Sequence, residues 1–156
     1  MTNKSSLNAL RAQFVEEVAV TSRRLRTLFN ARVRARGLTL ARARTLIYLS
    51  RKDGMLQIEL AEMLEIEAPT AGRLLDWLEA QDLIERRPME GDRRAKQIIL
   101  TEEGRKLAAE LNLLSNEIRE EVLAGIPEQD LRMASQVLRT VIQKIPTVAG
   151  SESDSE

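Results

Sequence analysis

The segment of residues 84–100, IERRPMEGDRRAKQIIL, constrains the fold of this chain more than any other stretch. Apolar and polar residues alternate on both sides of a turn-forming Glu-Gly-Asp cluster, as they do in a half-buried β-hairpin. The pattern predicts strands over 84–89 and 96–100. Because Pro88 cannot donate a ladder hydrogen bond, the first strand should lie at the edge of its sheet.

The same hairpin is densely basic. A narrow, twisted, basic ribbon fits a nucleic-acid groove, where guanidinium groups meet phosphates and the negative potential of a narrow minor groove. The alternative is a solvated hairpin whose charges serve solubility. The helix-turn-helix pattern that directly precedes the hairpin favours nucleic acid. The cations are Arg86, Arg87, Arg93, Arg94 and Lys96.

Two short helices are predicted before the hairpin. Apolar spacing places the first over 57–64 and the second over about 69–81, with Glu-Ile-Glu as the turn between them. Pro69 suits the first position of the second helix, where its missing N–H costs nothing. Two short helices joined by a tight turn are typical of a helix-turn-helix motif. The second helix should bury Ala71, Leu74, Leu75 and Leu78 and present Thr70, Arg73 and Trp77 on a different face.

Trp77 permits two interpretations. Its ring contacts the DNA backbone or a thymine methyl group, or it packs against the hairpin or the preceding helix. We favour packing, because an aromatic side chain near the end of a helix more often fills a gap.

The N-terminal part of the chain predicts two further helices. Apolar residues at spacings of three and four run from Leu7 to Val33, and Gly37 should end this helix. So long a stripe is hard to bury within a small monomer, so it indicates a partner helix. Thr39 is the predicted N-cap of the next helix. Met55 and Leu56 are expected to pair with the hairpin as a very short strand.

The C-terminal part predicts two long helices. Thr101 should cap the first, and Gly125 should end it. Pro127 should start the second, and Pro146 should stop it. The remaining residues, 147–156, have the composition of a disordered acidic tail.

The residue types narrow the function. The chain has no Cys and no His, so thiol chemistry is excluded and the commonest metal ligand and general acid–base are missing. No pair of carboxylates stands out, so we expect neither an enzyme nor a metal or cofactor. No apolar run reaches the roughly 18 residues of a membrane span, and no signal-peptide pattern is present. A cytoplasmic protein is expected.

The charge is unevenly distributed along the chain. Residues 1–52 hold 12 Lys and Arg against 2 Asp and Glu, whereas residues 53–156 hold 12 against 22. This asymmetry suggests an anionic partner, or else pairing between the two parts of the chain.

The order of elements resembles the MarR family of bacterial winged-helix transcription regulators, and within it the SlyA-type subgroup. The specific part runs over residues 59–104, where DRRAK is followed closely by LTEEG. The resemblance implies a mainly α fold with a small β-hairpin. In it, a winged helix-turn-helix over 37–101 is flanked by dimerisation helices over 1–36 and 102–146, with 147–156 as the tail.

The resemblance also implies how DNA is bound. The second helix of the motif enters the major groove, and the hairpin, or wing, reaches the adjacent minor groove. Within the wing, Asp92 pairs with and orients Arg94, which fixes that side chain before binding. Together with the residues singled out above, the expected DNA-binding set is Thr70, Arg73, Trp77, Arg86, Arg87, Asp92, Arg93, Arg94 and Lys96.

The implied function is a homodimeric regulator that reads a pseudo-palindromic operator in double-stranded DNA. A repressor released by a small phenolic or anionic ligand is expected, with an unknown ligand site. The alternatives are a ligand-independent activator or antisilencer, and a winged-helix module whose basic face binds an acidic protein. Candidate partners for a ligand carboxylate are Arg24, Arg32, Arg34 and Arg42.

Two positions depart from the family pattern. Leu56 stands where a hydroxyl residue often caps the first helix of the motif. Asp82 stands where a glycine is common, and Asp adopts the left-handed conformation less easily. We expect both to affect local stability more than function.

Overall fold

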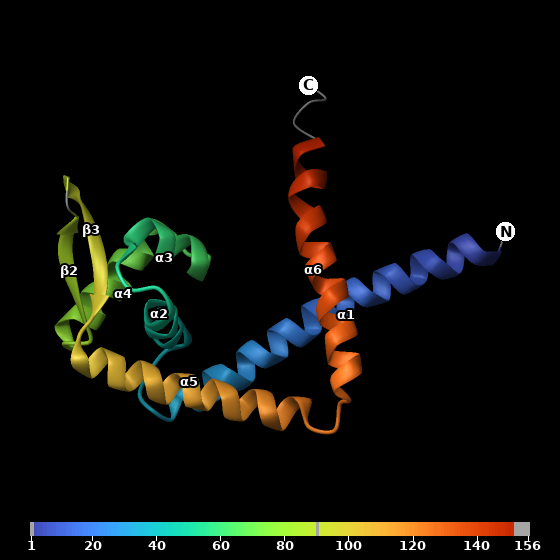
Figure 1. Cartoon of the computed structure of the whole chain (residues 1–156), viewed down its shortest axis with the longest axis horizontal. Coiled ribbons are helices and arrows are strands. Elements are labelled where there is room, and N and C mark those ends of the chain that lie inside the picture. The colour runs from blue at the N-terminus through green and yellow to red at the C-terminus, as the bar shows by residue number, and fades with distance from the viewer. Residues whose placement is uncertain (1, 90, 152–156) are drawn as a thin grey trace. The chain divides into compact units, whose positions relative to one another are not determined.

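The structure is a computed structural model that describes the backbone of residues 2–89 and 91–151 and the side chains of 4–89, 91 and 95–146. The chain forms two compact units, Met1–Ile118 and Arg119–Glu156. The elements in chain order (Figure 1) are α1 (Thr2–Arg34), α2 (Leu40–Arg51), β1 (Met55–Leu56), α3 (Gln57–Leu64), α4 (Ala68–Ala80), β2 (Ile84–Met89), β3 (Asp92–Leu100), α5 (Glu102–Leu123) and α6 (Glu128–Ser151).

The strands form one antiparallel sheet in the order β1-β3-β2. The predicted hairpin and the short strand at Met55 are therefore confirmed, and Pro88 lies on an edge strand as predicted. However, β3 begins at Asp92, earlier than the predicted 96. The reason is that pairing resumes beyond a register shift after Pro88 and brings Met89 opposite Asp92.

The hydrophobic core of the first unit joins the helices to one face of this sheet. Leucines at 46 and 49 of α2 and at 75 and 78 of α4 are almost fully buried, as are Ile98 and Leu100 of β3. Leu111 and Leu114 extend the core onto α5. Leu74, predicted to be buried, is only partly so. The mainly α fold with a small sheet, predicted from the sequence, is confirmed.

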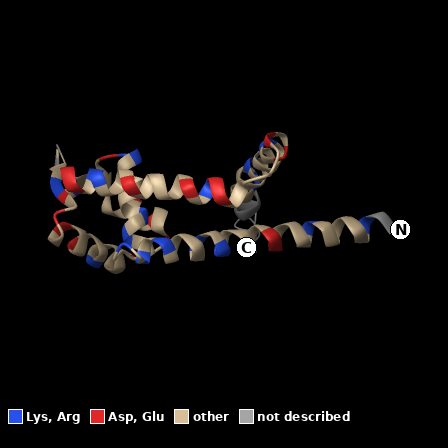
Figure 2. Cartoon of the chain, turned by 90° about the horizontal axis from the view of Figure 1, so that it is seen from below, with Lys and Arg blue, Asp and Glu red and all other residues tan. Residues whose placement is uncertain are grey.

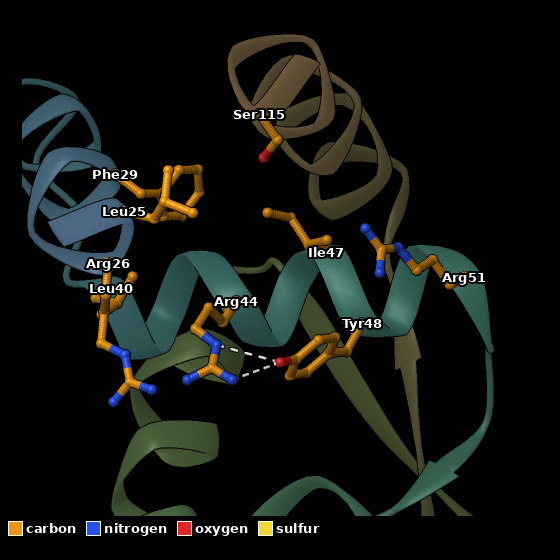
Figure 3. Close-up of a pocket in the computed structure, with 9 residues that line it drawn as sticks. All are labelled: Leu25, Arg26, Phe29, Leu40, Arg44, Ile47, Tyr48, Arg51 and Ser115. Atoms are coloured by element: carbon orange, nitrogen blue, oxygen red, sulfur yellow. Dashed lines mark hydrogen bonds between the residues drawn. The ribbon is translucent and has the colours of Figure 1, made fainter. Parts of the chain in front are cut away.

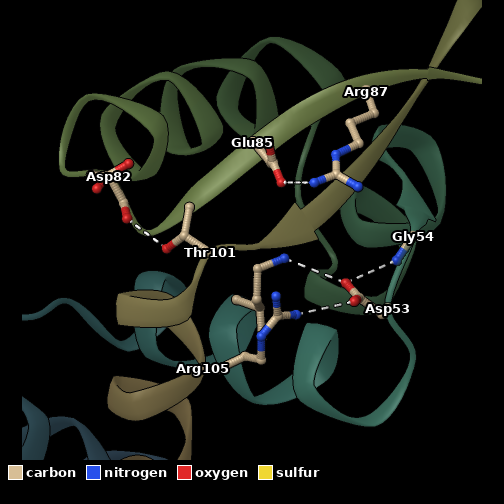
Figure 4. Close-up of polar contacts among 8 residues, drawn as sticks. Asp53, Gly54, Asp82, Glu85, Arg87, Thr101 and Arg105 are labelled. Atoms are coloured by element: carbon tan, nitrogen blue, oxygen red, sulfur yellow. Dashed lines mark hydrogen bonds and ion pairs between the residues drawn. The ribbon is translucent and has the colours of Figure 1, made fainter.

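Polar caps fix the ends of several elements. The Thr39 hydroxyl accepts a hydrogen bond from the backbone N–H of Arg42, and the Thr101 hydroxyl accepts one from Gly104 at 3.0 Å. Both predicted caps are thereby confirmed. Asp82 has a φ of +57°, and its carbonyl accepts a 2.6 Å hydrogen bond from the Thr101 hydroxyl (Figure 4).

The start of α3 has half of a capping box. Leu56 has no side-chain acceptor, so only the reciprocal bond forms: Glu59 Oε2 accepts from the Leu56 N–H at 2.8 Å. A hydrogen bond from Lys52, followed by the one from Leu56, lowers the pKa of Glu59. The N-terminus of α3 thus keeps a carboxylate in place of the missing hydroxyl.

Asp53 joins three elements of the first unit. Its Oδ1 accepts hydrogen bonds from the backbone N–H groups of Gly54 at 3.2 Å and Leu100 at 3.3 Å. Its Oδ2 lies 3.4 Å from Arg105 Nη1 (Figure 4). The carboxylate therefore ties the turn before β1 to the end of β3 and to α5.

Both terminal helices expose apolar residues. On α1, only the last turns, with Leu28, Phe29 and Val33, pack on the core, while Leu10 and Val15 are 61% and 66% exposed. The apolar stripe of α6 is exposed in the same way, at residues that include Val137, Leu138, Val141, Ile142 and Ile145.

The predicted end of the last helix is wrong. Helix α6 continues through Pro146 to Ser151, so residues 147–151 of the predicted disordered tail are helical. A proline removes one helical hydrogen bond and bends the axis, but here the preceding turns propagate the helix across it, since elongation is cooperative. Residues 152–156 lie outside the described residues.

Candidate nucleic-acid interface

Helix α4 has one buried and one exposed face. Ala71, Leu75 and Leu78 are buried, and Pro69 lies in the first turn, where the lack of an N–H is harmless. Burial of this face leaves Thr70 and Arg73 exposed to solvent on the other. The exposure of Thr70 and Arg73 agrees with the sequence prediction, whereas Trp77, predicted on the same face, is partly buried.

Arg73 carries an available positive charge. Its Nη2 lies 3.5 Å from the Thr70 hydroxyl, which is a weak hydrogen bond. Among the residues that the structure describes, no carboxylate forms an ion pair with Arg73. An exposed, uncompensated guanidinium on this helix suits a nucleic-acid contact.

Trp77 is partly buried and packs against the hydrophobic core. The guanidinium carbon of Arg42, from α2, lies 3.5 Å from the centroid of its ring. This geometry supports the packing interpretation of Trp77. The side chain stacked on the ring comes from α2, a partner that helical periodicity had not indicated.

Arg86 of β2 points toward α4. Only 18% of its side chain is exposed. It donates hydrogen bonds to Asp76 Oδ1 at 2.6 Å, to Glu79 Oε2 at 2.9 Å and to the carbonyl of Gly72 at 3.4 Å. Arg86 shares its strand face with the buried Ile84, because side chains alternate along a strand. Its charge is compensated, so the structure does not place it with the exposed cations.

The other wing cations differ in their surroundings. Arg87 forms an ion pair with Glu85, two residues away on the same face of β2 (Figure 4). Lys96 is exposed and lies opposite Pro88 in the ladder. Strand β3 begins at the hairpin turn with three further candidates, Asp92, Arg93 and Arg94. The structure describes their backbone but not their side chains.

A groove of about 260 Å³ lies between α2 and the helix-turn-helix motif. It brings Arg42 beside Thr70 and Arg73. From the sequence, Arg42 was a candidate partner for a ligand; the structure places it with the DNA-binding candidates instead. Helical periodicity does not predict that Arg42 lies beside Thr70 and Arg73, because this proximity depends on how α2 packs on α4. The groove is lined by Thr39, Ala41, Arg42, Ile66, Thr70, Arg73 and Leu74.

A surface cavity of about 300 Å³, largely open to solvent, lies among α1, α2 and α5 (Figure 3). Its walls combine apolar side chains, such as Phe29 and Ile47, with three arginines. Arg44 donates hydrogen bonds to the Tyr48 hydroxyl from Nε at 3.2 Å and from Nη2 at 2.6 Å. The cavity is lined by Leu25, Arg26, Phe29, Leu40, Arg44, Ile47, Tyr48, Arg51 and Ser115.

The arginines of this cavity differ from the ligand partners expected from the sequence. Most Lys and Arg residues of α1 fall in its C-terminal half (Figure 2), but only Arg26 among them lines the cavity. The other two are Arg44 and Arg51 of α2. The candidates Arg24, Arg32, Arg34 and Arg42 do not line it.

Neither a membrane-spanning helix nor a metal-binding cluster is found among the described residues. No helix among them is long and apolar enough to cross a membrane. No cluster of acidic side chains within the described part of the chain has the make-up to hold a metal ion.

Comparisons with known proteins agree with this architecture. A family model described as MarR family matches residues 36–95. The transcriptional regulator PA3341, whose crystal structure is known, is 37% identical in sequence to this chain. The match covers 86% of this chain and 98% of that one, with a TM-score of 0.79.

Two more distant structures agree in fold alone. A putative MarR family transcriptional regulator from Listeria monocytogenes, complexed with 26mer DNA, is 21% identical and has a TM-score of 0.76, with 91% of this chain and 95% of that one covered. The transcriptional regulator SlyA is also 21% identical; its TM-score is 0.71, and 92% of this chain and 99% of that one are covered.

Proposed function

Since this chain belongs to the MarR family of transcription regulators, we propose that it binds a pseudo-palindromic operator in double-stranded DNA as a homodimer. The observation that carries this proposal is the exposed face of α4, where Thr70 and an uncompensated Arg73 lie beside Arg42. In a helix-turn-helix protein this helix enters the major groove, and the two helices of a dimer lie about one DNA turn apart.

The exposed apolar stripes of α1 and α6 support dimerisation. Leu10 of α1 and Ile142 of α6 are 61% and 65% exposed, and an apolar stripe left exposed on a long helix is typical of an interface. We assign dimerisation to residues 1–36 and 102–146 and DNA binding to residues 37–101. The regulator would act in the cytoplasm.

The wing would complete the DNA contact. We assign Arg94 to the minor groove, oriented by Asp92, with Lys96, Arg87 and Arg93 near the phosphates. The beginning of β3 at Asp92 supports this assignment, because it places this segment beside the hairpin turn.

Replacement of Asp92 with Ala tests the wing assignment by the sign of its effect. Charge counting predicts tighter DNA binding, because a negative charge is removed. Preorganisation of Arg94 by Asp92 predicts weaker binding, and Arg94→Ala should weaken it as well. The measurement is a titration of each variant against operator and scrambled duplexes at several salt concentrations. Tighter operator binding by folded, dimeric Asp92→Ala would reject the pair.

The cavity among α1, α2 and α5 supports regulation by a small anionic ligand. Its volume of about 300 Å³ lies at the lower end of the range for small-molecule sites. Apolar walls with arginines suit a small aromatic carboxylate. Because α2 lines both this cavity and the groove that contains Arg42, a ligand here can disturb DNA binding. The protein would then act as a repressor that the ligand releases.

Salicylate is the probe for this ligand site. It should weaken operator binding, whereas uncharged phenol should act more weakly. Arg51→Met removes one cation from the cavity and should lower salicylate sensitivity by at least about tenfold, because a hydrogen bond to a charged group contributes about 1.5–3 kcal/mol. Arg36→Met, outside the cavity, is the control. Equal sensitivity in the two variants would reject Arg51 as a ligand contact.

A further inference from the structure

Arg42 lies beside the exposed face of α4 although it belongs to α2. Its guanidinium carbon is 3.5 Å from the centroid of the Trp77 ring, and it lines the same groove as Thr70 and Arg73. A helix outside the helix-turn-helix motif therefore brings a cation to the surface proposed for DNA.

The charge of Arg42 is oriented but not compensated. Among the described residues, no carboxylate forms an ion pair with it, and the first turn of α2 contains no acidic residue. Arg86 shows the opposite arrangement, since Asp76 and Glu79 both pair with it. Stacking on an aromatic ring occupies one face of a guanidinium, while its N–H groups point outward in the plane and stay available to an acceptor.

We propose that Arg42 donates hydrogen bonds to a DNA backbone phosphate beside the major groove that α4 enters, and that Trp77 is the positioning residue that fixes its guanidinium. The proposal rests on the proposed function. A phosphate fits better than a base edge, because Arg42 belongs to α2 and not to α4. It lies at the border of the exposed α4 face that carries Thr70 and Arg73. The planar fork of Arg matches phosphate oxygens. The assignment also gives a role to the aromatic residue that shares a face with Thr70 and Arg73.

The test is the salt dependence of binding by Arg42→Gln in the full-length protein. The probe is a fluorescent duplex that the wild-type protein has selected from a random-sequence pool. Removing one phosphate interaction per subunit should make the log–log salt slope shallower by about 1.8 for the dimer. If the log–log plots of wild type and variant meet at about 1 M salt, the binding constant of the variant at about 0.1 M should be roughly 60-fold lower than that of the wild type. The preference for the selected duplex over a scrambled one should be unchanged, because phosphate contacts read no base.

Arg23→Gln, at an exposed position of α1, is the matched control, because it removes the same charge outside the groove. Because α1 belongs to the region assigned to dimerisation, sedimentation must first show that this variant remains a dimer. Its slope should remain close to that of the wild type. Arg42→Lys keeps the charge without the planar stack, so it should keep the slope but bind more weakly.

The role of Trp77 is tested by a double-mutant cycle. Trp77→Leu keeps an apolar side chain but removes the ring, so DNA binding should weaken, and adding Arg42→Gln should then cost less than it does in the wild type. Trp77→Phe, which retains a ring, should restore most of the affinity. Urea unfolding of each variant separates a loss of binding from a loss of fold.

The outcomes separate this inference from the proposed function. Suppose that duplex binding by the wild type depends steeply on salt. Equal salt slopes for Arg42→Gln and Arg23→Gln would then overturn the phosphate contact alone. Strictly additive losses in the cycle would overturn the role of Trp77. A wild-type protein that binds no duplex would refute the proposed function and this inference with it.

Discussion

Replacing Arg73 with Ala should weaken operator binding by about 1–3 kcal/mol for each base that the side chain reads, and should relax specificity at one position of each half-site. The reason is that Arg73 is exposed on α4, and its only hydrogen bond to a described residue is the weak one to Thr70. Its guanidinium is therefore free to reach a base edge in the major groove. The measurement is a titration against a set of operators, each changed at a single base pair.

Arg86→Ala is the matched control for Arg73→Ala, because both remove one arginine from the same region. Arg86 is held between Asp76 and Glu79, so its loss should lower the free energy of unfolding by about 1–2 kcal/mol, a modest value because both acids are substantially exposed. Base preference should not change. If Arg86→Ala relaxed specificity as strongly as Arg73→Ala, the assignment of the two arginines would be wrong.

Gly104→Ala should lower the free energy of unfolding by about 2 kcal/mol. A Cβ atom at Gly104 would lie 1.9 Å from the backbone oxygen of Leu83. The same oxygen accepts the backbone N–H of Thr101 at 3.2 Å. The start of α5 would have to move away from the segment before β2, which loosens the joint between the wing and α5. Urea unfolding measures the change.

Gly72→Ala provides the control for Gly104→Ala. Gly72 is also helical, but a Cβ there would meet only Gln57 Nε2, at an ordinary 3.5 Å. Alanine favours a helix over glycine by up to about 1 kcal/mol, so this variant should be neutral or more stable. Gly104→Ala with wild-type stability would show that α5 tolerates a side chain against Leu83.

The elements of the fold could be predicted because their signals are local. Thr39 and Thr101 cap helices with their own hydroxyls, and Pro88 can occupy only an edge strand. The exposed face of α4 followed from the spacing of its leucines. The helix end predicted at Pro146 is not observed, because the local effect of this proline competes with the cooperativity of a long helix.

The candidate site was less predictable because its chemistry depends on packing between elements. A count of positive charges cannot show that Arg86 turns toward Asp76 and Glu79 on another element. The stack of Arg42 on Trp77 joins residues that are far apart in the chain. No periodic pattern in the sequence relates such pairs.

The most direct test of sequence-specific binding by a dimer is selection of duplexes from a random-sequence pool by the full-length protein. We expect enrichment of an inverted repeat whose half-sites lie about one helical turn, roughly 10 base pairs, apart. A winged-helix module that binds an acidic protein would retain DNA weakly and without sequence preference. A pool that stays random after repeated selection at moderate salt would contradict the proposed function.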